Sequence, residues 1–374
     1  MHHVDLGLGH LRISSTEAAR PDTAAREYGP AAGYPALREA VARWENVAAE
    51  EVAITTGASL ALVATLTTLP RPCSILCPRP YYPAYPAMAS AMGVELVFYD
   101  LDPERGWLPA PGALSRCIRP DTRALLWNFP GNPTGSLPSA ALIDEVREIV
   151  SRQELLVVSD EVYADFVYAA ALPSSRDAFG TERVVRVRSF SKAFEMPGER
   201  LGYVVADPAR TAIISRAHWA LAMCPPASSQ AHGLRALGAD AASRPAVLKA
   251  KLAANRDSVS RILAECSGVR FHVPEAGIFY WIEVVDSPIG SQHLAQACAA
   301  AGVTVMPGTA FGVHRPTYIR ASFAVPEQEA LAGFEALVRF IGSMSHAQRS
   351  FTTGGGVRRH GRGTERSVDL RQRP

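Results

Sequence analysis

The residues best suited to chemistry in this sequence are a serine and a lysine that end an apolar run, with an arginine close behind. The run covers residues 184–188, and Ser189, Lys192 and Arg200 follow it. A buried ammonium group is costly to desolvate, so burial favours the neutral amine. A neutral lysine amine attacks carbonyl carbons and forms a Schiff base. The alternative is a solvated loop lysine beside an arginine that forms a salt bridge.

Ser189 and Arg200 add a second property to this stretch. A hydroxyl donor and a fixed guanidinium group together suit a phosphate. A compound that carries both a carbonyl and a phosphate is pyridoxal 5'-phosphate (PLP). The stretch therefore indicates a covalent site for PLP.

Three further motifs follow apolar runs. Residues 56–59 open a helix, and exposed amides at a helix N-terminus bind anions. Asn132 lies in a turn that is dense in Gly, Pro and Asn, which indicates a rigid loop. Asp160 and Tyr163 end another run, although Asp160 could equally be a helix cap. Each motif alone could be an ordinary turn, but all of them fall at carboxyl ends of strands in one predicted sheet, where such sheets bind ligands.

The elements that would position these residues alternate along the chain. Short apolar runs, several of them continuous as in strands covered on both faces, are separated by helical stretches. This order predicts an α/β fold, with a large domain whose seven-stranded, mostly parallel sheet is flanked by helices. The predicted strands are 52–55, 74–77, 96–99, 124–128, 155–159, 184–188 and 203–206, and the helices include one from Pro35 and those at 60–69, 85–92, 140–151 and 208–219.

The pattern changes after about residue 237, where a smaller α+β domain is predicted. Its expected elements are helices at 246–265, 292–301 and 327–341 and strands near 271–273, 279–283, 303–305 and 318–321. Residues 345–374 are rich in Arg, Gly, Ser and Thr and poor in apolar residues, which predicts a disordered tail.

Composition argues against several classes of function. The 374 residues, 48% of them hydrophobic and 20% charged, can fill more than one domain. A formal charge of +2, spread along most of the chain, gives no reason to expect nucleic acid as a partner. No apolar run reaches the ~18 residues of a membrane span, and no signal peptide opens the chain. The six scattered cysteines form no zinc pattern, so we expect no metal, reduced thiols and a cytoplasmic location.

Taken together, the motifs resemble the class I/II aminotransferases, PLP-dependent enzymes of the aspartate aminotransferase fold. The resemblance runs from about residue 5 to residue 340. It is carried by YGPAAGYPALR at 28–38, NPTG at 132–135, DEVY at 160–163, Ser189 and Lys192 with Arg200, and YIR at 318–320. It implies an enzyme that moves an amino group between an L-amino acid and a 2-oxo acid in a ping-pong reaction.

The resemblance also implies the catalytic residues. Lys192 forms the Schiff base with the cofactor and then moves the substrate proton. Asp160 pairs with the pyridine nitrogen, and Tyr163 and Asn132 hydrogen-bond the phenolic oxygen. Tyr82 stacks on the face of the ring.

The implied phosphate ligands come from two parts of the chain. They are the amides of Gly57, Ala58 and Ser59, together with Ser189 and Arg200. Tyr28 reaches the phosphate in the partner subunit, so the resemblance implies a homodimer with shared active sites. It further implies that residues 1–45 join the small domain and the dimer interface, that 46–237 form the PLP-binding domain, and that 238–344 form the small domain.

The substrate residues implied are Arg320, which binds the α-carboxylate, and Gly9, whose backbone lies nearby. Relatives specific for dicarboxylates usually add an arginine from the partner subunit. Trp219 lies at or near that position here, and an indole offers an apolar wall or a face for a cation. We therefore expect a neutral, aromatic or cationic amino donor rather than aspartate. The alternative is that Trp219 is an ordinary interface aromatic.

Two other functions share these cofactor motifs: a PLP-dependent β-eliminating lyase, such as a C–S lyase, and a PLP-sensing regulatory domain. We expect the regulatory domain less, because no helix-turn-helix segment precedes the fold.

Two features depart from the family pattern. Only 27 residues precede Tyr28, so we expect a short N-terminal arm or none. The loop at 195–199 is a less usual link between the lysine and the arginine.

Overall fold

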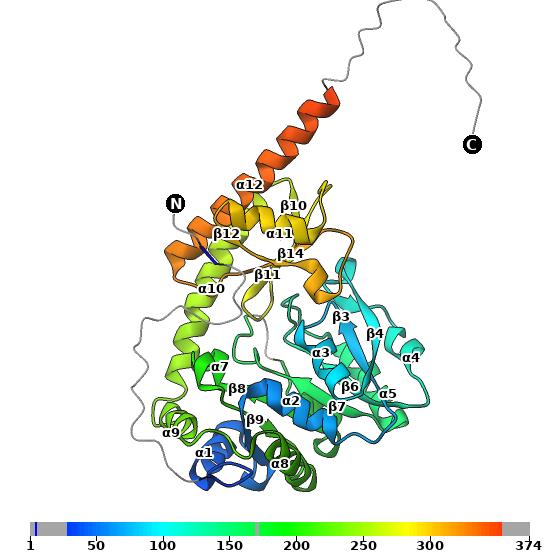
Figure 1. The fold of residues 1–374 in the computed structure, drawn as a ribbon, viewed down its shortest axis with the longest axis vertical. Coiled ribbons are helices and arrows are strands. Elements are labelled where there is room, and N and C mark those ends of the chain that lie inside the picture. Colours follow the sequence, from blue (N-terminus) through cyan, green and yellow to red (C-terminus); the bar gives the residue numbers. More distant parts are fainter. Residues whose placement is uncertain (1–3, 6–27, 169–171, 354–374) are drawn as a thin grey trace, which may run out of the picture.

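The structure is a computed structural model that describes residues 4–5, 28–168 and 172–353 (Figure 1). The predicted substrate residue Gly9 lies outside the described residues, as does most of the predicted tail.

The large domain is built on an eight-stranded mixed sheet with the order β2-β9-β8-β7-β6-β3-β4-β5. The run from β8 to β4 is parallel, whereas β9 is antiparallel to both of its neighbours and β5 is antiparallel to β4. The strands are β2 Val52–Thr55, β3 Ser74–Arg79, β4 Glu95–Asp102, β5 Leu108–Pro109, β6 Thr122–Trp127, β7 Leu156–Asp160, β8 Val184–Ser189 and β9 Gly202–Val205.

All seven predicted strands are present, and the additional strand, β5, has only two residues. A segment this short carries no periodic signal. The sheet is mixed because β8 connects to β9 through a short helix and a turn. Parallel neighbours would need a long crossover that returns along the sheet.

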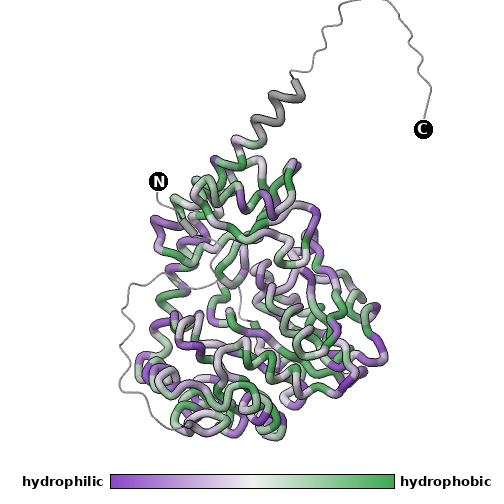
Figure 2. Tube along the Cα trace, viewed as in Figure 1, coloured by the Kyte–Doolittle hydropathy of each residue, from purple (hydrophilic) through white to green (hydrophobic). Residues whose placement is uncertain are grey.

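Both faces of the sheet are covered, as the continuous apolar runs predicted. Alternate residues of β6 show this, because Ala124 and Leu126 belong to one core cluster while Leu125 and Trp127 belong to another. The first cluster is completed by helices α2 Gly57–Thr67, α3 Ala84–Ala91 and α8 Pro208–Ala222. The second is completed by α4 Ala113–Cys117, α5 Ala140–Gln153 and α6 Ser175–Phe179. Figure 2 shows how hydrophobic and hydrophilic stretches alternate along the chain.

A third part of the large-domain core lies at the β2 edge. Here α1 (Pro35–Glu45) and α9 (Ala227–Ala236) pack together, and Leu37 and Val41 of α1 join a cluster with Ile54 and Tyr203 of the sheet. Helix α1 therefore packs on the large domain, within the segment 1–45 that was expected to join the small domain and the dimer interface. The strand β1 (Val4–Asp5) does pair with β12 (Val303–Thr304) of the small domain. The domain boundaries remain a prediction.

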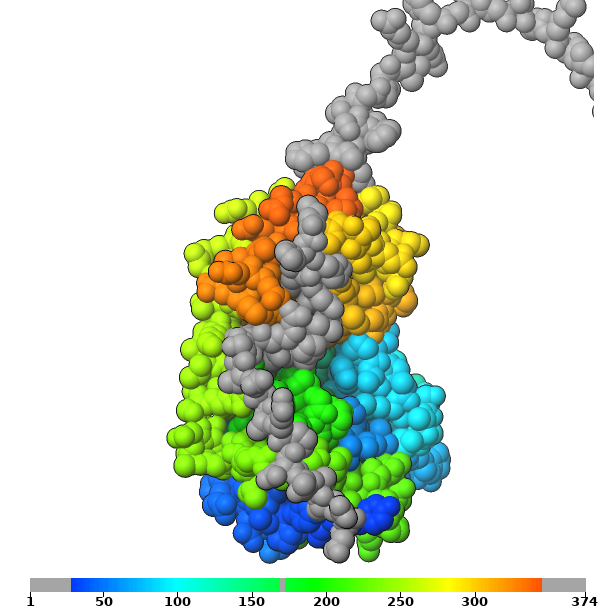
Figure 3. All heavy atoms as spheres, turned by 60° about the vertical axis from the view of Figure 1, so that its left-hand side comes forward, coloured from blue at the N-terminus to red at the C-terminus, as the bar shows by residue number. Residues whose placement is uncertain are grey.

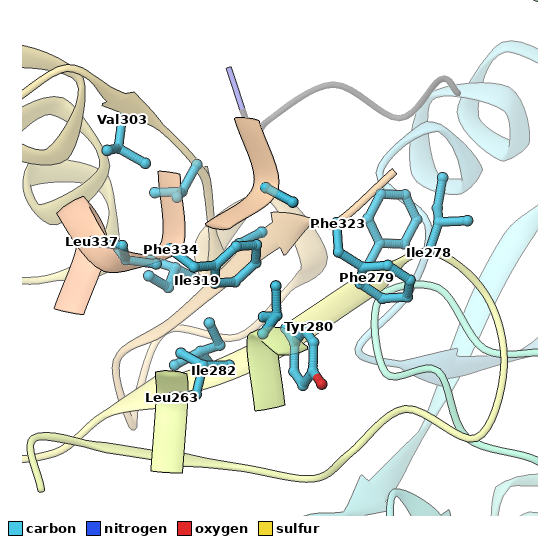
Figure 4. Close-up of a cluster of buried hydrophobic side chains, with 14 of the residues drawn as sticks. Leu263, Ile278, Phe279, Tyr280, Ile282, Val303, Ile319, Phe323, Phe334 and Leu337 are labelled. Carbon is cyan, nitrogen blue, oxygen red and sulfur yellow. The ribbon is translucent and has the colours of Figure 1, made fainter. Parts of the chain in front are cut away.

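The small domain has a four-stranded antiparallel sheet with the order β10-β11-β14-β13. Its strands are β10 Val269–Phe271, β11 Phe279–Val284, β13 Met306–Pro307 and β14 Tyr318–Ser322. Its helices are α10 Ser243–Ala264, α11 Ser291–Ala300 and α12 Glu327–Thr353. Figure 4 shows apolar side chains from the strands and helices meeting in its core. In Figure 3 the small domain lies above the large one, and α10 runs up the left-hand side of the view.

Helix α12 continues to Thr353, beyond its predicted end at residue 341, so the first part of the predicted tail is helical. The sequence has no proline or glycine from 343 to 353, and the glycines at 354–356 supply the first helix breakers.

None of the described helices is long and apolar enough to cross a membrane. Among the described residues, no group of three His, Cys, Asp or Glu side chains could hold a metal ion.

Candidate active site

A cavity of about 540 Å³ lies where the carboxyl ends of the large sheet face the small domain. Most of the predicted site residues line it: Ala58, Ser59, Tyr82, Asn132, Asp160, Tyr163, Ser189, Lys192, Arg200 and Arg320. Gly57 adjoins this wall. Two predicted residues do not line the cavity of this chain, because Tyr28 is 82% exposed and Trp219 is 49% exposed on the outer surface.

Lys192 is held in the cavity by the short helix α7 (Phe190–Ala193), which starts directly after β8. Ser189 caps this helix, since its Oγ accepts a hydrogen bond from the Ser191 amide at 3.0 Å. Burial, together with the positive charges of Arg320 and Arg200, lowers the pKa of Lys192 to about 7. A substantial fraction of this amine is therefore neutral at neutral pH, as a nucleophile or a base requires.

Asp160 ends β7 and is buried at the cavity wall. Its Oδ2 accepts a hydrogen bond from the Tyr85 hydroxyl at 2.7 Å, and its Oδ1 lies 3.4 Å from the Val162 amide nitrogen. Burial raises the pKa of Asp160, while the Tyr85 hydroxyl acts in the opposite direction. A cationic ring nitrogen facing this carboxylate would stabilise its charged form further.

Arg320 brings the small domain into the site from β14. Its Nη1 donates to Asn132 Oδ1 at 3.0 Å, and its guanidinium carbon lies 3.8 Å from the ring centroid of Phe279 and 5.0 Å from that of Phe311. Burial lowers the pKa of Arg320 to about 10, so it stays charged at neutral pH. Asn132 is fixed from its other side, because its backbone amide donates to Asn128 Oδ1 at 3.0 Å. A hydrogen bond thus joins the Arg320 guanidinium of the small domain to the Asn132 side-chain amide of the large domain.

Two glycines shape the end of the cavity where the phosphate is predicted to bind. A Cβ on Gly57, which has a φ of +75°, would lie 2.6 Å from Arg200 Nη2. A Cβ on Gly202 would lie 2.8 Å from the Ala58 nitrogen. Without side chains there, the guanidinium of Arg200 reaches the N-terminus of α2. Amides, hydroxyl groups and a guanidinium that converge in this way match a phosphate dianion.

Some residues of the site were not found from the sequence. Tyr85 bonds Asp160, Asn128 holds Asn132, and the rings of Phe279 and Phe311 enclose Arg320. The sequence did give a reason to suspect Tyr85. It follows Tyr82 by three residues, a spacing that puts both side chains on the same side at the start of α3. The two phenylalanines lie in apolar segments that resemble any other core sequence.

This arrangement is that of a PLP-binding site in a two-domain α/β enzyme. Comparison with known proteins gives the family: residues 11–337 match the model of class I and II aminotransferases, and the chain belongs to that family. It is 32% identical to the aspartate aminotransferase of Musicola paradisiaca, over 84% of this chain and 81% of the relative. It is 31% identical to the aspartate/prephenate aminotransferase of Thermus thermophilus, over 84% of this chain and 83% of the relative.

The fold agrees with this assignment. The structure of Thermus thermophilus aspartate aminotransferase with maleate matches with a TM-score of 0.82 at 27% identity, and covers 91% of this chain and 92% of that one. The chain is a PLP-dependent aminotransferase, which acts on amino acids and 2-oxo acids. The β-eliminating lyase is not favoured.

Proposed function

We propose that PLP is held covalently by Lys192, with its pyridine nitrogen at Asp160 and its phosphate between Arg200 and the N-terminus of α2. The observation that carries this proposal is the buried Lys192 amine, which lines the same cavity as these two groups and has a pKa lowered to about 7. The residues fit the cofactor because the carboxylate and the cluster of anion-binding donors lie at separate parts of one cavity wall. Gly57 and Gly202 leave space that a Cβ would fill.

The reaction divides between the cofactor and the protein. When bound, PLP supplies an electron-withdrawing ring that stabilises negative charge at the amino-acid α-carbon. Asp160 keeps the ring nitrogen protonated, since an adjacent carboxylate favours the cation. Tyr163 and Asn132 hydrogen-bond the phenolic oxygen. Because Arg320 already donates to Asn132 Oδ1, the hydrogen bond to that oxygen would come from Asn132 Nδ2. Tyr82 covers one face of the ring.

Lys192 has a second role once the substrate amine has displaced it. Its Nζ would be placed to take the proton from the amino-acid α-carbon and to hold it for return. A base for this step must be neutral and close to the proton, and the lowered pKa meets the first condition. Holding base and substrate together can contribute on the order of 7–11 kcal/mol at its best.

Arg320 orients the substrate by a bidentate contact with the α-carboxylate. Asn132 and the two phenylalanine rings support its guanidinium, so little rotational freedom remains to be lost on binding. This contact would direct the α-carbon toward Lys192. The return half-reaction, with a 2-oxo acid, uses the same carboxylate contact and completes a ping-pong cycle.

The position of the lysine gives the most direct test of the proposal. Purified protein should be yellow, and borohydride reduction followed by peptide mapping should find the reduced cofactor on Lys192. Lys192→Ala should lose both the absorbance band of the lysine-bound cofactor and the transamination. Reduced cofactor on a different lysine would refute the assignment.

We propose that the amino donor is neutral, aromatic or cationic, although the relatives' names include aspartate. The cations among the described cavity residues are Lys192, Arg200 and Arg320, and each already has a role. No described lining residue of this chain remains to pair with a second carboxylate. Trp219 would add an apolar wall from the partner subunit.

A panel of donors tests this preference. The cofactor absorbance should change faster, per unit concentration, with phenylalanine, methionine or arginine than with aspartate in single-turnover mixing. A rate constant per concentration at least about tenfold higher for aspartate would overturn the preference and leave the cofactor assignment intact.

We also propose a homodimer with shared sites. Tyr28 is 82% exposed in the single chain, as expected of a residue that acts in a partner's site. Exposed apolar side chains lie on α8, on its C-cap residue and on α9: Ile213, Trp219, Leu221, Met223 and Leu234. We further propose a cytoplasmic location, which the six free cysteines support.

A further inference from the structure

Two histidines, His218 (buried) and His232 (largely buried), contact residues next to the predicted phosphate ligands without lining the cavity themselves. His218 on α8 is 0% exposed, and the side chain of His232 on α9 is 10% exposed. Among the residues that the structure describes, His218 Nδ1 and His232 Nε2 have no hydrogen-bond partner. Burying an unsatisfied ring nitrogen costs stability, so each histidine calls for a reason other than stability.

His218 holds the turn that precedes α2. Its Nε2 accepts a hydrogen bond from the Thr56 amide at 2.9 Å, which requires a neutral ring with the proton on Nδ1. Thr56 is the N-cap of α2, next to the Gly57, Ala58 and Ser59 amides. The hydrogen bond therefore fixes the peptide group that directly precedes the three anion-binding amides. Burial lowers the pKa of His218 and so favours the neutral ring that the contact needs.

His232 holds the other half of the phosphate site. Its Nδ1 lies 2.6 Å from the Glu199 carboxylate, and Glu199 directly precedes Arg200. Arg200 has a φ of +52°, a left-handed conformation that a non-glycine residue adopts only when its surroundings enforce it. Arg200 Nη1 also donates to Pro197 O at 2.9 Å, within the same loop. This is the loop at 195–199 whose sequence departs from the family pattern.

We propose that His218 and His232 are positioning residues that hold the two halves of the phosphate site in register. A phosphate must meet the α2 amides and the Arg200 guanidinium together, and these two halves come from separate segments of the chain. Preorganisation of both halves raises affinity for the phosphate and leaves the aldehyde chemistry at Lys192 unchanged. The proposal rests on the assignment of this end of the cavity to the phosphate of PLP.

The test compares PLP with pyridoxal, which has the aldehyde but no phosphate. Dissociation constants of both are measured on apoprotein by absorbance, and the pyridoxal-to-PLP ratio gives the contribution of the phosphate. His218→Leu and His232→Leu should each reduce this ratio about tenfold, because each removes one partly buried hydrogen bond. His218→Gln should restore it, since a glutamine Oε1 can accept from the Thr56 amide. His293→Leu is the matched control, because His293 is exposed on α11.

The outcomes distinguish a failure of the predicted phosphate site from a failure of the proposed role of the histidines. A wild-type protein that binds PLP no better than pyridoxal would refute the phosphate site itself. A wild-type preference that survives in both leucine variants would refute the role of the histidines. Equal loss of affinity for both ligands would also refute it, since that indicates a general structural defect. If His218→Leu does not fold, His218→Asn serves instead, because its polar side chain is too short to reach Thr56. If His232→Leu does not fold, Glu199→Gln replaces it.

Discussion

At the scale of single residues, the chemistry depends on ionisable side chains whose charged forms are disfavoured by burial. Lys192 is buried beside two arginines, and Asp160 is buried with a tyrosine hydroxyl as its main support. Burial disfavours the charged form of each group, and the cofactor would give each of them a partner. Desolvated groups of opposite character in one cleft are typical of catalytic sites.

The lowered pKa of Lys192 makes a prediction about the stability of the apoprotein. The lysine pKa is 10.5 ordinarily and about 7 in the fold, so between these values the unfolded chain binds a proton that the native protein does not. Stability therefore rises with pH across this window. Lys192→Met lacks this slope, so it should be more stable than wild type at pH 7, with the difference vanishing toward pH 10.5. Urea unfolding of both apoproteins across this range measures it. Parallel pH profiles would mean that Lys192 is solvated.

Asp160 gives a second prediction. Asp160→Asn should fold and bind PLP, because the amide keeps the size and can still accept from Tyr85. It should slow proton abstraction by orders of magnitude, because a neutral amide does not keep the ring nitrogen protonated. Single-turnover deuterium exchange at the α-carbon measures this step. A wild-type rate would reduce Asp160 to a cap of the following turn.

At the scale of elements, the strand ends bring together residues that are distant in the sequence. The continuous apolar runs identified every long strand, and the motifs after them line one cavity. The sequence did not reveal that β8 also carries buried arginines. Arg186 pairs with Glu161 at 2.9 Å and with Glu45 at 3.1 Å, and Arg188 pairs with Asp165 at 3.0 Å. These partners come from α1 and from the segment after β7, so only the tertiary fold shows them.

The close approach of β9 to α2 makes the prediction at this scale. A Cβ at Gly202 would meet the Ala58 nitrogen at 2.8 Å, so Gly202→Ala should push α2 away from Arg200. Overpacking of this kind costs about 1–3 kcal/mol, and PLP affinity should fall together with stability. Calorimetry and cofactor titration measure the two effects. Gly198→Ala is the control, because a Cβ there meets nothing within 4 Å. Equal behaviour of the two variants would show that the contact relaxes freely.

At the scale of the whole molecule, the small domain adds Arg320 to a site that is otherwise built on the large sheet. The β14 strand could be predicted from its apolar residues, and the resemblance gave Arg320 its role. The aromatic support from Phe279 and Phe311 could not be predicted, because it depends on how β11 and the 3-10 helix Gly308–Phe311 pack around Arg320 of β14. Tyr28 and Trp219 are the predicted site residues that remain on the outside of the single chain.

The exposed position of Tyr28 leads to a prediction about assembly. If Tyr28 completes the partner's phosphate site, Tyr28→Phe and Lys192→Ala homodimers should both be poor enzymes, for different reasons. In a mixed dimer, one site combines an intact Lys192 with an intact Tyr28, while the other lacks both. Random subunit exchange makes half of the dimers mixed, so the mixture should recover up to about a quarter of wild-type activity. Subunit exchange followed by a transamination assay measures this recovery, with each parent alone as the control. Full activity in a demonstrably monomeric preparation would exclude shared sites, and no recovery after verified exchange would place Tyr28 outside the partner's site.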